Sequence, residues 1–160
     1  MDRLSLVRRG LLAALLLTAH AAHANDLMDN ADLAGGAVAA TGPAVQALQL
    51  PDGQTAQVLQ QGSDNLADVS QVGTHQLANI LQQGSEQQAF ILQQGDNLYA
   101  TILQIGQGNT ADITQVGSDN QAAIAQIGND NNASIEQLGS GLSSSVVQYG
   151  NGQNVEIIQY

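Results

Sequence analysis

The sequence has no cysteine, no tryptophan and only one phenylalanine among 160 residues. Disulfide bonds are therefore excluded, and there is little material for an ordinary aromatic core. Lysine is absent and arginine is rare: the three arginines, Arg3, Arg8 and Arg9, lie near the N-terminus, against 14 acids in the chain. The remaining residues lack the cations that bind nucleic acid or an anionic membrane surface, so we expect neither as a partner.

Residues 1–24 have the three parts of a secretory signal peptide. After the arginines comes an apolar run, Leu11 to Ala19, and then a small-x-small cleavage site, Ala22 to Ala24. The apolar run is about half as long as the roughly 20 residues of a membrane-spanning helix, so we expect no membrane insertion. Cleavage after Ala24, or alternatively after Ala21, would leave an exported chain without any lysine or arginine.

Residues 25–48 are rich in small residues, glycine and proline, as in Ala34 to Ala37 and Gly42-Pro43. Such a segment behind a cleavage site is typical of a flexible arm. We interpret it as a targeting signal that the export machinery recognises. Disorder without a function, and a short helix over Leu27 to Ala34, are the alternatives.

An eleven-residue phrase then occurs ten times over residues 49–160, without insertion or deletion. A fixed period of this kind indicates a repeat architecture. Glycine stands at place three of every phrase except the first, which has Pro51, and an eleventh phrase starts at Gln159. Glutamine opens each phrase: Gln49, Gln60, Gln71, Gln82, Gln93, Gln104, Gln115, Gln126, Gln137 and Gln148.

Places six, eight, ten and the next glutamine share one face of an extended chain, because side chains alternate along a strand. Place six is mostly an amide, and place eight is mostly alanine. Place ten is always β-branched and is the predicted core: Val58, Val69, Ile80, Ile91, Ile102, Ile113, Ile124, Ile135, Val146 and Ile157. Glycine with Asp, Asn or Ser between the glutamine and place six indicates a tight turn.

Each phrase therefore predicts one short strand and one turn, and two phrases predict a coil of 22 residues. The ten phrases predict an all-β fold, a two-sheet β-solenoid of about five coils that rises about 4.8 Å per coil. A right-handed helical supercoil also has a period of eleven. The recurring glycines and the β-branched column oppose that alternative.

In a solenoid the amide columns are expected to stack as ladders, each side chain donating to its copy one coil away. The ladder comprises the ten glutamines together with Asn65, Asn109, Asn120 and Asn131. Interior amides find a partner and terminal ones do not, which favours the addition of another coil. Because the last phrase has no features of a capping repeat, we expect a copy of the chain to extend it.

We number the phrases from the one that Gln49 opens. Place nine of the even-numbered phrases carries an acid in alternate coils, at Asp68, Asp112 and Glu156. We interpret these residues as gatekeepers that slow stacking at neutral pH through repulsion, with plain solubilisation as the alternative. Assembly should then quicken as the pH falls towards about 4. The remaining outward places hold apolar rows, which predict an interaction surface unless the arm covers them.

No residue pattern predicts a catalytic, metal or cofactor site. His75 is the only histidine after the leader, and the Asp-Asn pairs of the turns lack the calcium-binding nonapeptide. Ser143 to Ser145 have no histidine nearby in the repeat frame and no nucleophile elbow. We predict a protein that is not an enzyme and requires no cofactor.

The phrase Gln-x-Gly-x-x-Asn-x-Ala-x-Ile/Val-x, as in residues 104–114, resembles the curlin repeat of bacterial curli fibre subunits. The resemblance covers residues 49–160. It implies an extracellular functional amyloid of adhesion and biofilm matrix, which passes through the periplasm and a dedicated outer-membrane channel with accessory proteins. It also implies polymerisation with itself and with a second curlin, and the counterparts of the family's assembly residues are Gln60, Asn65, Gln126 and Asn131.

The resemblance leaves two subunit roles open. The family's minor, nucleating subunits end in a basic repeat, which is absent here, so we favour the major, fibre-forming role. The uniform, aliphatic repeats with few Gly or Tyr resemble those of a minor subunit instead. The Ser that often precedes the Gln in the family's repeats is irregular in this sequence. A monomeric secreted β-solenoid that binds ice, glycan or another ligand is the alternative of another class, although Thr-x-Thr rows are absent.

Overall fold

A computed structural model describes residues 17–18, 44–50 and 53–160, with side chains described from residue 53 onward. All twelve regular elements of these ranges are β-strands, and none of their residues forms a helix long and apolar enough to cross a membrane. The strands are β1 (Leu17–Thr18), β2 (Ala44–Leu50), β3 (Gln54–Ser63), β4 (Leu66–Thr74), β5 (Leu77–Ser85), β6 (Gln88–Asp96), β7 (Tyr99–Gln107), β8 (Thr110–Ser118), β9 (Gln121–Asn129), β10 (Asn132–Ser140), β11 (Ser143–Tyr149) and β12 (Asn154–Gln159).

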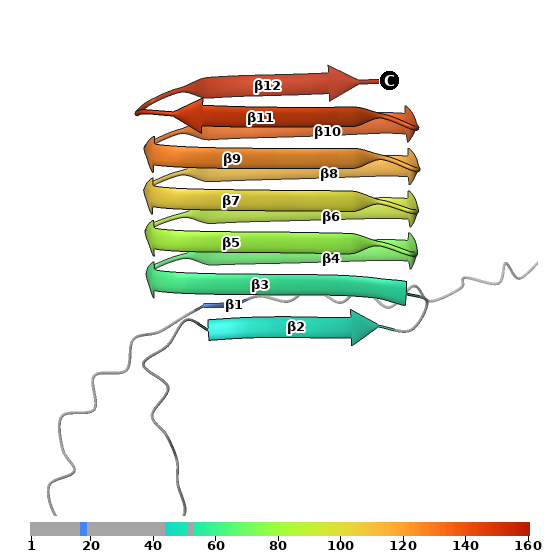
Figure 1. The fold of residues 1–160 in the computed structure, drawn as a ribbon, viewed down its shortest axis with the longest axis horizontal. Coiled ribbons are helices and arrows are strands. Elements are labelled where there is room, and N and C mark those ends of the chain that lie inside the picture. Colours follow the sequence, from blue (N-terminus) through green and yellow to red (C-terminus); the bar gives the residue numbers. More distant parts are fainter. Residues whose placement is uncertain (1–16, 19–43, 51–52) are drawn as a thin grey trace, which may run out of the picture.

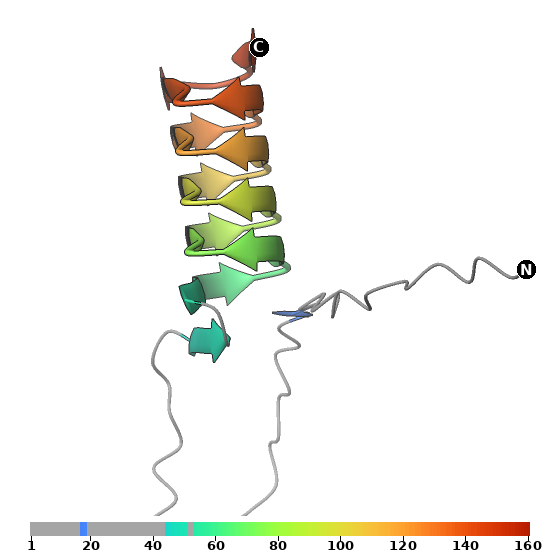
Figure 2. The same cartoon turned by 90° about the vertical axis from the view of Figure 1, so that its right-hand side faces the viewer.

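The strands form two six-stranded sheets. The β4 sheet has the order β1-β4-β6-β8-β10-β12, and the β3 sheet has the order β11-β9-β7-β5-β3-β2. The chain runs out along one sheet and back along the other, so that β3–β4 to β11–β12 make five stacked coils (Figure 1). Figure 2 shows the two sheets as two layers of one narrow stack.

From β3 to β12 every pair of neighbouring strands is parallel, and each residue lies beside the residue 22 places further on. In the β3 sheet, for example, Val58 pairs with Ile80 and Ile80 pairs with Ile102. Identical or similar side chains therefore stack directly on one another. This arrangement confirms the predicted two-sheet β-solenoid of about five coils.

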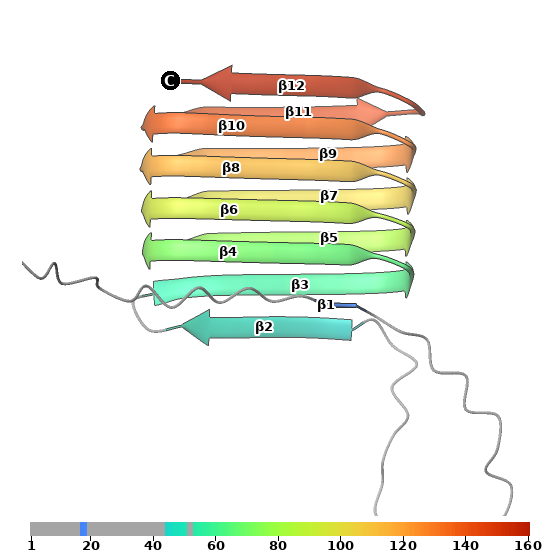
Figure 3. The same cartoon turned by 180° about the vertical axis from the view of Figure 1, so that it is seen from behind.

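The two N-terminal strands depart from this rule. β1 pairs antiparallel with β4, and β2 pairs antiparallel with β3. Both lie at the same end of the stack (Figure 3). β1 falls within the predicted signal peptide, and β2 crosses the predicted boundary between arm and repeats. The rest of the predicted leader and arm lies outside the described residues.

The interior between the sheets contains the alanines of place eight and the β-branched residues of place ten. Nine of the ten predicted core residues are buried, namely Val58, Val69, Ile80, Ile91, Ile102, Ile113, Ile124, Ile135 and Val146. The tenth, Ile157 in the last coil, is partly buried against the others, as is Val155. The core is thin, because each strand from β3 to β10 contributes only one alanine and one β-branched side chain to it.

The turns differ in detail from the expected ones, because place three belongs to the end of a strand. Gly84 is still within β5, with φ 132°, and a Cβ there would lie 1.8 Å from the carbonyl oxygen of Gly106 in the next coil. Only glycine permits that close approach. The reversal is made at place five, which is left-handed in every coil, including non-glycine residues such as Glu86 at φ 56°. The strands are consequently longer than the sequence pattern indicates.

Candidate functional site

Glutamine side chains form two continuous columns inside the solenoid, one along each sheet. Nε2 of each glutamine donates to Oε1 of the glutamine one coil further on. In the β3 sheet these bonds measure 2.6–2.9 Å and run from Gln60 through Gln82, Gln104 and Gln126 to Gln148. In the β4 sheet they measure 2.9–3.0 Å and run from Gln71 through Gln93, Gln115 and Gln137 to Gln159.

Each glutamine of the inner coils also joins the two sheets. The second hydrogen of Nε2 donates to a backbone carbonyl of the opposite sheet, as from Gln82 to Leu66 at 3.0 Å and from Gln104 to Gln88 at 2.9 Å. With both donor hydrogens and the acceptor engaged, the side chain of Gln104 can be fully buried. The sequence pattern places these glutamines on the inner face but gives no sign of the bond across the core.

The four asparagines of the predicted ladder have mainly backbone partners. Their Nδ2 atoms donate, at 2.7–3.0 Å, to glycine carbonyls 19 residues further on, from Asn65, Asn109, Asn120 and Asn131. Their Oδ1 atoms accept the N–H of the residue 22 places on. An amide-to-amide bond is recorded between Asn131 and Asn109 at 3.1 Å. Place six lies in the turn, where the backbone of the next coil is the nearest acceptor, so these side chains hold adjacent turns together.

Gln49, the first glutamine of the predicted ladder, is not in the column. It lies in β2 opposite Thr55, in the antiparallel pair with β3. In its phrase Pro51 stands where the others have glycine at positive φ, which the proline ring cannot adopt. The described columns therefore begin at Gln60 and Gln71.

The two ends of the columns are chemically different. In residues 53–160, buried side-chain oxygens without a partner are Gln60 Oε1, Asp68 Oδ1, Gln71 Oε1 and Gln87 Oε1. The two column oxygens lack a donor because no glutamine of the described columns precedes them, since Gln49 lies in the antiparallel β2. A buried acceptor without a partner costs about 1–3 kcal/mol. At the other end, Nε2 of Gln148 donates to the carbonyl of Asn132 at 3.0 Å and keeps a hydrogen for one further acceptor.

The three predicted gatekeepers lie in one column on the outer face of the β4 sheet, in the register Asp68, Phe90, Asp112, Ser134, Glu156. Partial burial raises the pKa of Asp112, the Thr114 hydroxyl that donates to its carboxylate lowers it, and the charge of Glu136 raises it. Glu136 belongs to the neighbouring strand β10. The acids are therefore closer together than place nine alone indicates.

The acids also divide between the two sheets. Each strand from β4 to β12 in the β4 sheet contains one acid: Asp68, Asp96, Asp112, Glu136 and Glu156. β3, β5, β7, β9 and β11 contain none. Exposed apolar side chains of this neutral sheet are Leu77, Leu81, Tyr99, Val147 and Tyr149, whereas Leu92 and Ile158 are exposed on the acidic one.

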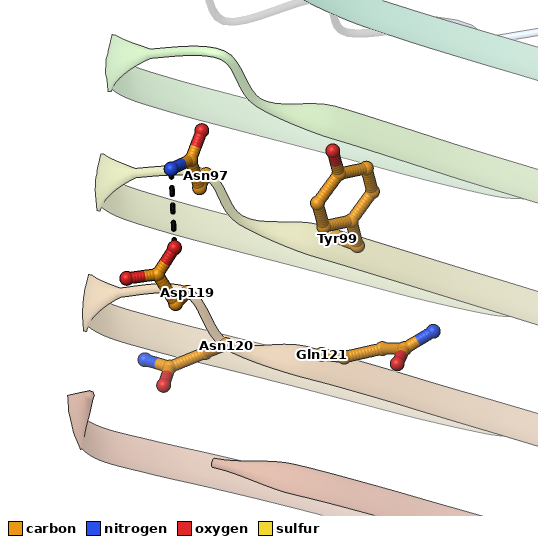
Figure 4. A pocket seen from close by; sticks show the side chains of 5 residues that line it. All are labelled: Asn97, Tyr99, Asp119, Asn120 and Gln121. Carbon is orange, nitrogen blue, oxygen red and sulfur yellow. Dashed lines mark hydrogen bonds between the residues drawn. The ribbon is translucent and has the colours of Figure 1, made fainter. Parts of the chain in front are cut away.

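An open hollow beside Tyr99 is lined by Asn97, Tyr99, Asp119, Asn120 and Gln121 (Figure 4). Within it Asn97 Nδ2 donates to Asp119 Oδ1 at 3.1 Å, and Asn120 donates to the carbonyl of Gly139. These polar groups connect one coil to the next. In the part of the chain that the structure describes, no three His, Asp or Glu side chains gather as a metal ion would require.

Comparison with known proteins gives one result. The family described as the curlin associated repeat matches residues 77–106, 106–139 and 128–160, which together make up more than half of the chain. A search of curated proteins found no match. The coil of β3 and β4 lies outside the matched residues, yet it has the same register and the same glutamine bonds as the others.

Proposed function

Because the chain belongs to the curlin family, we propose that it is a subunit of extracellular curli-type fibres in which copies join head to tail by β-strand stacking. Family and fold point to a structural, non-catalytic protein. The finer statement, polymerisation by stacking, rests on the ends of the stack, whereas the role in adhesion and biofilm matrix rests on the family alone.

One observation carries the proposal: the coil is a repeating unit whose partners are supplied by the next coil. Among the described residues, β11 and β12 are the outermost strands at one end of the stack, and no further strand pairs with them there. A second copy placed one coil beyond them, in the same 22-residue register, would set its β3 beside β11 and its β4 beside β12. Gln148 would then donate to the partnerless Oε1 of the copy's Gln60, and Gln159 to that of its Gln71.

The last coil supports the same contact through its apolar side chains. Val155 and Ile157 are only partly buried, although Ala133 and Ile135 at the same places one coil earlier have no exposed surface. Stacking of a further coil would bury the remaining apolar area, which favours association.

For the subunit's role we favour the major, fibre-forming one, because residues 25–160 contain no lysine or arginine for a basic terminal repeat. The nucleating minor role is the alternative, favoured by the uniform, aliphatic repeats. In either role we expect a second curlin, an outer-membrane export channel and its accessory proteins as partners. Export would run through the periplasm under direction of the signal peptide and arm.

The basic test is incubation of the purified exported chain. We expect fibres by electron microscopy, with a cross-β reflection near about 4.8 Å. A folded monomer that persists would contradict the proposal. Co-incubation with the second curlin of the same source separates the roles. If the lag phase of this chain is lost, this chain is the polymer that the partner nucleates.

Two glycines give a sharper test of the head-to-tail contact. At Gly128 a Cβ would lie 1.9 Å from the carbonyl oxygen of Gly150, whereas at Gly150 the nearest atom is Gln153 Nε2 at 3.6 Å. Both have positive φ, so alanine strains the backbone at either position. We expect Gly128→Ala to disrupt the solenoid. Gly150→Ala should retain β-sheet circular dichroism and lose fibre growth, because its clash arises only when another coil is added. Growth of Gly150→Ala at the wild-type rate would contradict this geometry.

A further inference from the structure

The edge of β3 that a second copy would need is already occupied by β2. Seven residues, Ala44 to Leu50, run antiparallel along β3, from Ala44 opposite Gln60 to Leu50 opposite Gln54. β5, β7, β9 and β11 follow β3 in parallel. β2 is therefore the one strand of this sheet that breaks the parallel order among the described residues. Figure 1 shows it beyond β3, at the opposite end of the stack from β12.

β2 covers the backbone edge of β3 without completing the side-chain column. Gln60 is 5 % exposed, and its Oε1 has no hydrogen-bond partner. In the next coil, Oε1 of Gln82 accepts a hydrogen bond from Nε2 of Gln60 at 2.6 Å. A strand that repeats the 22-residue register supplies such a donor, and the antiparallel β2 does not. The site beneath β2 thus retains an unfilled acceptor, which is unfavourable in a buried position.

The strand that does supply the donor is β11. It has the same interior pattern as the inner strands, with Val146 and Gln148 in register with Ile124 and Gln126. Placed against β3, β11 of another copy would set Val146 beside Val58 and Gln148 beside Gln60. It would also carry β12 onto β4, whose edge is free once the predicted signal peptide with β1 has been cleaved, so that both sheets continue.

We propose that β2 is a removable cap on the docking edge for a second copy of this chain, and that its release controls the rate of head-to-tail joining. The inference rests on the proposed assembly. β2 competes with β11 of a second copy for the edge of β3. Only three residues separate β2 from β3, which keeps its local concentration at that edge high. β11 of a second copy forms the fuller set of bonds and replaces β2 once the edge is free. The end with β11 and β12 needs no such release.

A reversible disulfide tests the cap. The chain has no cysteine of its own, and Ala47 lies directly opposite Gln57, whose side chain is exposed on the outer face. In Ala47→Cys/Gln57→Cys the two positions are suitably placed for a bridge between antiparallel strands. Added to preformed wild-type fibres, the oxidised variant should join at least tenfold more slowly at seed ends that present β11 and β12. Dithiothreitol should restore the wild-type rate.

Proline substitutions test the opposite direction. Gln46→Pro/Ala47→Pro removes two adjacent backbone N–H groups from β2, one of which faces β3, and should shorten the lag phase several-fold. Ala39→Pro/Ala40→Pro, outside β2, is the matched control and should leave the lag phase unchanged. Equal joining rates of the oxidised and reduced cysteine variant, or an unchanged lag in the β2 proline variant, would overturn the cap while fibres still form. Absence of fibres from the wild-type chain would instead overturn the proposed function.

Discussion

The two sheets of the solenoid are alike inside and different outside. Both have interior columns of alanine, a β-branched residue and glutamine, with the same hydrogen bonds from coil to coil. On the outside, every coil of the β4 sheet contributes one acid, and the strands β3 to β11 of the other sheet contribute none. Stacking dictates the interior, because each side chain has a copy above and below it. The outer faces are free of that constraint and are where the sheets acquire different properties.

The strongest test of this likeness is to remove a glutamine from each interior column. Gln104→Leu in the β3 sheet and Gln115→Leu in the β4 sheet should each lower the free energy of unfolding by about 3 kcal/mol. At Gln104 the substitution leaves Oε1 of Gln126 and the carbonyl of Gln88 without their donor, at about 1–3 kcal/mol each. Urea unfolding followed by circular dichroism measures the loss.

The matched controls make the same change on the outside. Gln83→Leu and Gln94→Leu alter exposed glutamines of the two sheets and should change stability by less than about 0.5 kcal/mol. If the two interior variants differed by more than about 1 kcal/mol from each other, the columns would not be equivalent, and the likeness of the two sheets would fail.

The interior was accessible from sequence because it has a period of two within each strand and a fixed place within each phrase. Ile113 and its counterparts, the alanines and the buried glutamines follow from that alternation alone. The fold class follows as well, because ten phrases without insertion permit regular stacking.

The parts that sequence did not predict depend on distances between coils. The glycines of place three permit contact with a carbonyl of the next coil, whereas in the sequence a glycine beside Asp, Asn or Ser indicates only a turn. The asparagines bind mainly the backbone at that turn, and a bond between two of them joins Asn131 to Asn109. The approach of Glu136 to Asp112 involves two different places of the phrase, so it is invisible when each place is compared only with itself. Most of β2 precedes the first phrase at Gln49, so comparison of the phrases does not predict its antiparallel pairing with β3.

The outer difference between the sheets can be tested through pH. The pKa of Asp112 is raised, mainly by burial, so the folded chain favours its protonated form. The stability it contributes is fully present below its ordinary pKa of 3.8 and is lost as the pH rises through the raised value. Asp112→Asn should remove this component, with a gain at neutral pH of less than about 1 kcal/mol for a partly exposed group.

Stability and fibre growth of Asp112→Asn, measured between pH 7 and pH 3, should accordingly depend less on pH than those of the wild type. Glu86→Gln removes an exposed carboxylate from a turn while keeping the shape of the side chain, and is the control for charge alone. Identical pH profiles for the wild type and Asp112→Asn would show that the acids of the β4 sheet only solubilise the chain.

The smallest expected effect lies in the turns that join the two sheets. Glu86 has φ 56°, a left-handed conformation that costs most residues more than it costs asparagine, and Asn97 occupies the same place at the same angle. Glu86→Asn should therefore stabilise the chain by about 0.5 kcal/mol, or roughly 2 °C in melting temperature, despite the loss of an exposed bond from Gln107. Glu156→Asn removes the same charge from the strand β12, where no positive φ occurs. An equal gain in both variants would assign the effect to reduced repulsion; a gain in Glu86→Asn alone assigns it to the backbone, and shows that the turns, like the interior and unlike the outer faces, are constrained by the geometry of the coil.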